Sequence, residues 1–163
     1  MKSDIKVINS TTFKDKRGYY WTTWKKGTLK KINFNHDKFS MSKRNILRGF
    51  HCDFKSWKLL TCVYGELLLV VLNVDNKKKS YLKYKKFILN YKKPKLILIP
   101  PNYANAYLCL SKECVLHYKW SYRGKYIDSK KQSSFRWNDP KFKIKWPIKK
   151  PILSNRDKNS KFL

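Results

Sequence analysis

The sequence contains few acidic residues. Ten Asp and Glu stand against 39 Lys and Arg in 163 residues, which gives a formal net charge of +29. A surface this basic attracts nucleic acids, acidic membranes and phosphorylated small molecules. The lysines occur as scattered pairs and triplets along the whole chain rather than in one basic helix or tail. We therefore interpret most of the charge as a solvated surface of lysine-rich composition, with polyanion binding as the alternative.

Long apolar runs are also missing. No stretch approaches the ~20 residues that a membrane-spanning helix needs, and residues 1–10 lack the apolar segment of a signal peptide. The four cysteines, Cys52, Cys62, Cys109 and Cys114, lie in apolar stretches without zinc-site spacing, so we expect buried free thiols. These features predict a soluble, cytoplasmic protein with no membrane partner.

Helical periodicity is nearly absent, and short apolar runs separated by turn residues dominate instead. Strands are predicted over residues 45–51, 58–64, 67–74, 81–89, 96–99, 103–110 and 114–122. The run over 67–74 is apolar nearly throughout, which predicts a strand covered on both faces. Prolines and weak periodicity over 137–163 predict an extended tail that wraps the sheets. We therefore expect a single all-β domain over residues 1–163, a sandwich or barrel.

Only three histidines are present, at positions 36, 51 and 117. His51 has the most suggestive neighbours, because Arg48 closely precedes it and Lys58 opens the next predicted strand. In an ideal strand Arg48 and His51 point to opposite faces, so they share a pocket only if Gly49 allows a bend. An Arg, a His and a Lys converging at the mouth of a barrel would suit a diphosphate and a developing oxyanion. A packed or surface position is the alternative for each histidine.

A series of motifs in order along the chain resembles one family. They are FKDKRG at 13–18, LRGFH at 47–51, KLL at 58–60, GE at 65–66, IPPN at 99–102, YK at 118–119, WNDP at 137–140, IKWP at 144–147 and LSNRD at 153–157. In order and spacing they are similar to the motifs of the dTDP-4-dehydrorhamnose 3,5-epimerase family. Each motif is weak alone, but the ordered set covers nearly the whole chain and is specific.

The resemblance implies a cupin-type jelly roll that forms a homodimer, with the first strands exchanged with or packed against the partner. It implies epimerisation of a nucleotide-linked 4-keto-6-deoxy sugar for surface polysaccharide, without a cofactor. It also implies roles for single residues: His51 as the base, Asp157 as the carboxylate that orients it, Tyr118 as the acid on the opposite sugar face, Lys58 and Arg48 around the C4 oxygen and the phosphates, and Arg17 at the nucleotide of the neighbouring subunit.

These residue types suit the reaction. A 4-keto group acidifies the hydrogens at C3 and C5, because loss of a proton gives an enolate. Histidine is a natural base, since its unperturbed pKa of about 6.5 lies near neutral pH, and an aspartate on its second nitrogen fixes the tautomer. A lysine near C4 would offset the enolate charge, and removing one such donor typically raises the activation barrier by about 3–4 kcal/mol. The chain has no His-x-His pair, so no metal site is expected.

The sequence departs from the family pattern at several binding positions. Asn105 stands where the family has a histidine, and an asparagine can hold a sugar hydroxyl but cannot move a proton at neutral pH. Asn73 replaces a family aspartate, and Thr22 replaces a glutamate near the nucleobase. These three changes leave thymidine recognition and inversion at C5 open. The stretches over 35–39, 61–66, 81–84 and 151–154, together with Asn105, resemble the branch that acts on GDP-linked 4-keto-6-deoxy-heptoses. The nucleotide, GDP or dTDP, and the sugar length therefore stay open, and His36 is expected at the pocket edge.

Other functions remain alternatives. A cupin without turnover or a basic nucleic-acid-binding protein would account for the charge, but an inactive pocket has no physical reason to keep His51, Asp157, Tyr118 and Lys58. Nucleic-acid binders also tend to gather lysines and stacking aromatics on one face, so we do not expect nucleic acid as a partner. A 3,4-ketoisomerase would use the same fold and a histidine base, and would differ in which proton moves and where it returns.

Overall fold

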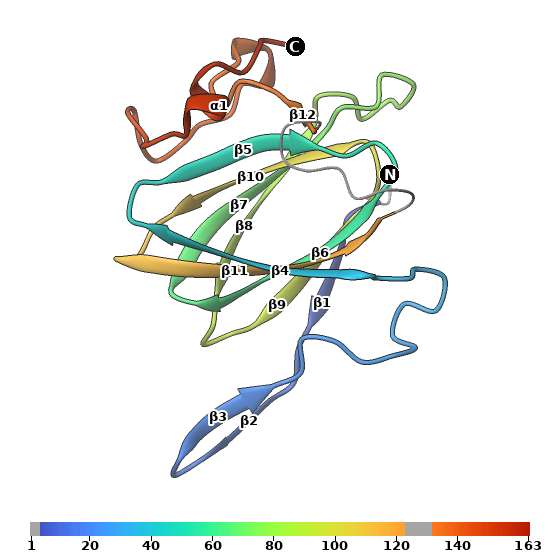
Figure 1. The fold of residues 1–163 in the computed structure, drawn as a ribbon, viewed down its shortest axis with the longest axis vertical. Coiled ribbons are helices and arrows are strands. Elements are labelled where there is room, and N and C mark those ends of the chain that lie inside the picture. Colours follow the sequence, from blue (N-terminus) through green and yellow to red (C-terminus); the bar gives the residue numbers. More distant parts are fainter. Residues whose placement is uncertain (1–3, 123–131) are drawn as a thin grey trace.

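The computed structural model describes residues 4–122 and 132–163, and in it two five-stranded antiparallel sheets face each other (Figure 1). The first sheet contains, in spatial order, β1 (Lys6–Asn9), β9 (Lys95–Ile99), β6 (Trp57–Tyr64), β11 (Glu113–Ser121) and β4 (His36–Lys43). The second contains β12 (Ser133–Ser134), β5 (Leu47–Cys52), β10 (Tyr103–Cys109), β7 (Glu66–Asn73) and β8 (Tyr84–Asn90). A separate hairpin joins β2 (Thr12–Asp15) to β3 (Gly18–Trp21).

The seven strands predicted from the apolar runs are all present, with bounds shifted by a few residues. The largest shift is at β8, which begins at Tyr84 because the preceding residues turn and Leu82 has a φ of 61°. The strands β1 to β4 lie outside the predicted ranges. In β4 exposed residues alternate with partly buried ones, and β2 is exposed throughout, so neither strand has the apolar content on which the predictions relied.

The main apolar core fills the space between the sheets. In β7, Leu69 and Val71 face this core, whereas Leu68 and Val70 belong to a second apolar cluster on the other side of the sheet. The whole strand is therefore buried except at its first residue, as predicted for a strand covered on both faces. Burial of each such side chain contributes roughly 1.5–3 kcal/mol to the stability of the barrel.

The C-terminal tail supplies the cover for the second sheet (Figure 1, orange to red). Phe142 is fully buried against this sheet, and the partly buried Trp146 and Leu153 pack beside it. The tail is mostly extended, as predicted, but it also contains one 3-10 turn, η2 (Pro140–Phe142), and one helical turn, α1 (Asn155–Lys158). Because the tail crosses the outer face of β5, it can place side chains beside the histidine of that strand.

The hairpin β2–β3 projects away from the barrel (Figure 1). Its aromatic side chains Phe13 and Tyr20 stack with ring centroids 5.2 Å apart, yet they are 53% and 65% exposed. On the edge strand β4, Phe39 and Met41 also face solvent. Large exposed apolar side chains in such positions are typical of surfaces that pack against another chain.

A bulge in β5 controls the direction of the side chains that precede it. His51 pairs with Asn105 of β10, but Arg48 pairs with Tyr107, so two residues of β5 face only one residue of β10. Gly49 lies in this bulge with a φ of 116°, and a Cβ added to it would lie 2.6 Å from the carbonyl oxygen of Asn105. Only glycine fits both the dihedral angle and the space. The bulge supplies the bend that the sequence requires if Arg48 and His51 are to share one pocket.

Gly49→Ala should destabilise the protein by more than about 1 kcal/mol, because alanine is strained at this φ and its Cβ would collide with β10. Urea unfolding measures the loss. Gly27→Ala is the matched control: Gly27 also has a positive φ of 92°, but no atom lies within 4 Å of the added Cβ. If both variants lost the same free energy of unfolding, the close contact between β5 and β10 at Gly49 would be contradicted.

Candidate active site

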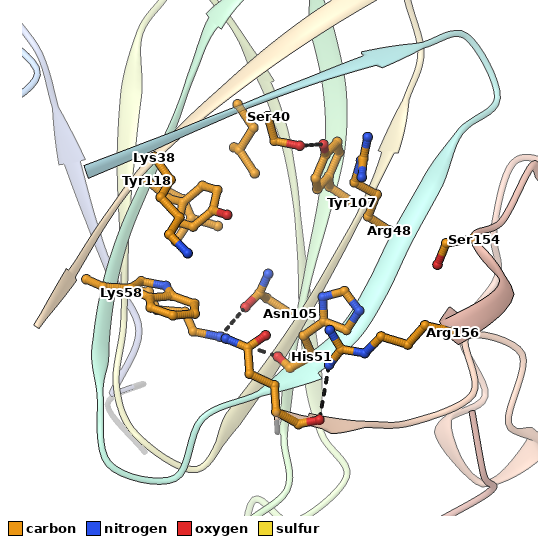
Figure 2. Close-up of a pocket in the computed structure, with 14 residues that line it drawn as sticks. Lys38, Ser40, Arg48, His51, Lys58, Asn105, Tyr107, Tyr118, Ser154 and Arg156 are labelled. Carbon is orange, nitrogen blue, oxygen red and sulfur yellow. Dashed lines mark hydrogen bonds between the residues drawn. The ribbon is translucent and has the colours of Figure 1, made fainter. Parts of the chain in front are cut away.

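A cavity of about 600 Å³ opens between the two sheets and the C-terminal tail (Figure 2). Its wall is polar and basic, with apolar and aromatic side chains between the charged groups. The lining residues are Lys38, Ser40, Arg48, His51, Lys58, Leu60, Asn105, Tyr107, Leu116, Tyr118, Trp120, Gln132, Ser154 and Arg156. This cavity therefore gathers five of the eight residues proposed from the sequence, and Asp157 lies directly behind it.

His51 is held by Asp157, which comes from the helical turn α1. The His51 Nε2 and Asp157 Oδ1 atoms are 2.6 Å apart, and Asp157 is only 2% exposed. The second carboxylate oxygen, Oδ2, accepts a hydrogen bond of 3.3 Å from the backbone N–H of Gly49. Because Nε2 is bound to the carboxylate, Nδ1 is the ring nitrogen of His51 that can take up a proton from a substrate.

The position of Asp157 follows from the local sequence. Ser154 caps α1, and its hydroxyl accepts a hydrogen bond of 3.1 Å from the Asp157 backbone N–H. Burial by itself would raise the pKa of the Asp157 carboxyl, but the hydrogen bond and charge of His51 and the N–H of Gly49 together hold that pKa below its ordinary value. The carboxylate is therefore ionised at neutral pH and can stabilise an imidazolium.

Lys58 is the buried cation of the cavity. It is 4% exposed, and its Nζ donates to Asn105 Oδ1 at 3.0 Å and lies 3.5 Å from the carbonyl oxygen of His51. The ring of Trp120 lies 5.4 Å from the same ammonium. Burial lowers the pKa of Lys58 from its ordinary value, because the charged form loses hydration. The lysine is thus poised to gain from a negative charge that develops inside the cavity.

Tyr118 lies across the cavity from His51 (Figure 2). Burial raises the pKa of its hydroxyl, and the nearby Tyr107 adds to this effect while Arg48 opposes it. The hydroxyl therefore stays protonated at neutral pH. His117, the next residue along β11 towards the N-terminus, faces the opposite side of the sheet, where its Nε2 lies 2.7 Å from Asp37 Oδ1.

Two arginines reach the cavity from different elements. Arg48 donates to Ser42 Oγ at 3.0 Å, and Arg156 of α1 donates to Ser134 Oγ at 2.9 Å. Figure 2 places both on the same side of the cavity, opposite Lys38 and Lys58. Two arginines on one side of a site suit a diphosphate, since one guanidinium group can donate two parallel hydrogen bonds to phosphate oxygens.

Arg156, Lys38 and Trp120 line the cavity, but no role was assigned to them from the sequence. Arg156 stands directly before Asp157 in the LSNRD motif, so its position in that motif could have marked it. The ammonium of Lys38 lies 4.9 Å from the Trp120 ring centroid. In a sequence with so many lysines, nothing in the local pattern separates Lys38 from a surface lysine.

Two of the residues proposed from the sequence lie outside the cavity. Arg17 is on the projecting hairpin, where its side chain is 83% exposed and pairs with Asp15 at 2.6 Å. His36 begins the edge strand β4, where its Nδ1 lies 3.0 Å from Asn35 Oδ1 and its ring contacts that of Tyr122 edge-on. Within a single chain, neither side chain belongs to the lining of the cavity.

Over the described ranges, 4–122 and 132–163, the His, Cys, Asp and Glu side chains form no group of three or more that could hold a metal ion. All four cysteines are buried free thiols, as predicted. Among the same residues, no helix has the length and apolar character needed to cross a membrane.

Comparisons with known proteins agree with this fold and identify a family. The sequence model for dTDP-4-dehydrorhamnose 3,5-epimerase matches residues 2–163. The curated dTDP-4-dehydrorhamnose 3,5-epimerase of Shigella flexneri is 25% identical over 164 residues, which cover 96% of this chain and 89% of the relative. That of Methanothermobacter thermautotrophicus is 28% identical over 166 residues, covering 95% and 87%.

A solved structure has the same fold. The crystal structure of dTDP-4-dehydrorhamnose 3,5-epimerase from Bacillus anthracis, with TDP and PPi bound, has a TM-score of 0.90 at 25% identity and covers 98% of this chain and 94% of its own. The jelly-roll barrel and its basic cavity thus define a cupin-type epimerase of sugar nucleotides. The chain belongs to the dTDP-4-dehydrorhamnose 3,5-epimerase family.

The low pKa of Asp157 links stability to pH. A carboxyl whose pKa is depressed by folding stabilises the protein above its unfolded-state pKa of about 4, and this contribution is lost as the pH falls through the folded-state value. Asp157→Asn should therefore lower the unfolding free energy at all pH values above about 4, and the difference from wild type should shrink as the pH falls below about 4. Urea unfolding from neutral pH into this acid range measures the difference, with Asp53→Asn as the control for the chemical change; a difference that grows below about pH 4 would contradict the assignment.

Proposed function

We propose that the protein inverts C3 of a nucleotide-linked 4-keto-6-deoxy sugar, a hexose or heptose used in surface polysaccharide, through an enolate. The proposal also includes the case in which both C3 and C5 are inverted. The observation that carries it is the His51–Asp157 pair, which faces Tyr118 across a cavity lined by Lys58 and the two arginines. Family membership supports the same chemistry.

His51 begins the reaction as the base. Nδ1 takes the proton from C3, the electron pair of the C–H bond forms the C3–C4 double bond, and the carbonyl π pair moves to the C4 oxygen. The imidazolium that forms is stabilised by Asp157, whose oxygen lies 2.6 Å from Nε2. A pre-aligned base and acid of this kind contribute roughly 10²–10⁴-fold to the rate of a proton transfer.

Lys58 and Tyr118 complete the inversion. The Lys58 ammonium, which is itself only 4% exposed, offsets the charge on the C4 oxygen. The Tyr118 hydroxyl then gives its proton to C3 from the face opposite His51, and the enolate returns to the ketone. His51 has gained a proton and Tyr118 has lost one, so exchange with solvent restores both groups before the next turnover.

Arg48 and Arg156 would hold the diphosphate, which places the sugar towards Lys38 and Lys58. The nucleotide that contains this diphosphate is either dTDP or GDP. The curated relatives are named for dTDP, whereas Asn105 favours GDP. The two nucleotides differ in their bases, and assays with both sets of substrates decide between them.

The projecting hairpin fits a homodimer. The exposed Phe13 and Tyr20 of this hairpin gain cover if it packs on a second copy, and the edge strand β4 exposes Phe39 and Met41 as a complementary surface. Arg17 at the hairpin turn is remote from the cavity lining of its own chain. In such a dimer its guanidinium would serve the nucleotide in the partner's cavity.

Wild-type protein should incorporate deuterium from D2O at C3, or at C3 and C5, of a GDP- or dTDP-linked 4-keto-6-deoxy sugar, and His51→Ala should slow this by at least about 10²-fold because the base is lost. NMR of the recovered sugar measures both the rate and the position. Nucleotide binding by His51→Ala, followed by calorimetry, is the control that its cavity remains intact.

Each other result of this experiment has a defined meaning. A 3-keto product would indicate a 3,4-ketoisomerase. No exchange into any of these substrates by folded wild-type protein would overturn the proposed function, and salt-sensitive binding of DNA at physiological ionic strength would then favour a nucleic-acid-binding role.

Arg17→Ala and His51→Ala should complement each other when mixed, if Arg17 serves the partner's cavity. Random reassociation of equal amounts makes half of the dimers mixed, and one of the two cavities in each mixed dimer contains both wild-type residues. Activity at low substrate concentration should therefore recover to about a quarter of the wild-type value. The assay is the exchange rate before and after co-refolding; no recovery would mean that Arg17 acts within its own chain or has no part in the site.

A further inference from the structure

Asn105 occupies a central position in the cavity. In β10, Asn105 pairs with His51 of β5 on one side and with Val71 of β7 on the other. Its side chain reaches across to the other sheet, where Oδ1 accepts a hydrogen bond of 3.0 Å from Lys58 Nζ. The asparagine thus lies between the proposed base and the buried cation, close to where the reacting carbon and oxygen must lie.

The contact with Lys58 decides which end of the amide faces the substrate. A lysine ammonium has only N–H donors, so it requires the oxygen of Asn105 and excludes the NH₂ group from that position. The amide nitrogen Nδ2 consequently points into the cavity (Figure 2). Asn105 therefore presents a hydrogen-bond donor to the substrate, whereas a group meant to accept a bond from a sugar hydroxyl would present its oxygen.

We propose that Asn105 is a further catalytic residue, whose Nδ2 and the Nζ of Lys58 together form a two-donor site for the C4 oxygen of the enolate. This inference rests on the proposed function. Lys58 has a double role, since it donates to the oxygen directly and also fixes the amide in the donor orientation. Trp120 and the carbonyl of His51 hold the ammonium in place from the other sides.

The two donors stabilise the enolate more than the ketone. The C4 oxygen gains charge only when the proton leaves C3, and donors already held in place need no reorganisation at that moment. Burial of Lys58 strengthens its hydrogen bond to this oxygen, because a buried ammonium has few water molecules as alternative partners. This arrangement also explains how an asparagine, which cannot transfer a proton at neutral pH, still contributes to the chemistry.

Asn105→Leu tests the proposal, since leucine keeps the approximate volume and removes the donor. The kcat for deuterium exchange should fall about 10²–10³-fold, with KM changed only a few-fold, because the donor acts in the transition state. Asn76→Leu, in an exposed turn outside the cavity lining, is the matched control and should retain wild-type kcat. A raised KM with unchanged kcat would overturn the proposal in favour of ordinary sugar binding.

A double-mutant cycle separates donation by Asn105 from mere support of Lys58. If Asn105 acted only by holding the lysine, Asn105→Leu would cost nothing further in a Lys58→Met background; as a donor in its own right, it should cost at least about another tenfold in kcat. If Asn105→Leu does not fold, Asn105→Ser, whose hydroxyl is too short to reach the place of Nδ2, replaces it in the cycle. If wild-type protein catalyses no deuterium exchange, the proposed function is refuted. If the Asn105 variants retain the wild-type kcat, only the inference about Asn105 is refuted.

Discussion

The hydrogen bond between His51 and Asp157 joins two parts of the chain that are separated by 106 residues. It links β5 of the barrel to the C-terminal tail, so the base is oriented only when the tail is docked. The carboxylate is buried, and burial without partners would be costly for a charged group. The Gly49 N–H and the cap of α1 by Ser154 therefore belong to the same unit, because they satisfy and place the carboxylate.

Positive charge dominates the cavity around that unit. Its lining contains Lys38, Arg48, Lys58 and Arg156, while the carboxylate of Asp157 is directed at His51. A sugar nucleotide brings a diphosphate and, in the proposed reaction, an enolate, so the cations are matched to charges that the substrate supplies. The large overall charge of the chain is a separate property, since most lysines lie outside this cavity.

The strands and several site residues could be predicted because they depend on local pattern. Apolar runs marked β5 to β11, and the ordered motifs identified His51, Lys58, Tyr118 and Asp157. The edge strand β4 was not predicted, because alternating exposure leaves it no apolar run. Lys38 was missed for a related reason: its cavity position depends on which face of β4 turns inward, and only the pairing with β11 fixes that.

The sequence alone therefore determined the all-β class, the buried central strand, the family and the residue types of the proposed chemistry, since these depend on composition, periodicity and motif order. The tertiary structure decided which side chains meet. The bulge at Gly49 turns Arg48 and His51 to one side, and the inter-sheet contact with Lys58 sets the orientation of the Asn105 amide. Such contacts join residues far apart in the chain, so their geometry depends on the packing of two sheets and a tail, which no local pattern encodes.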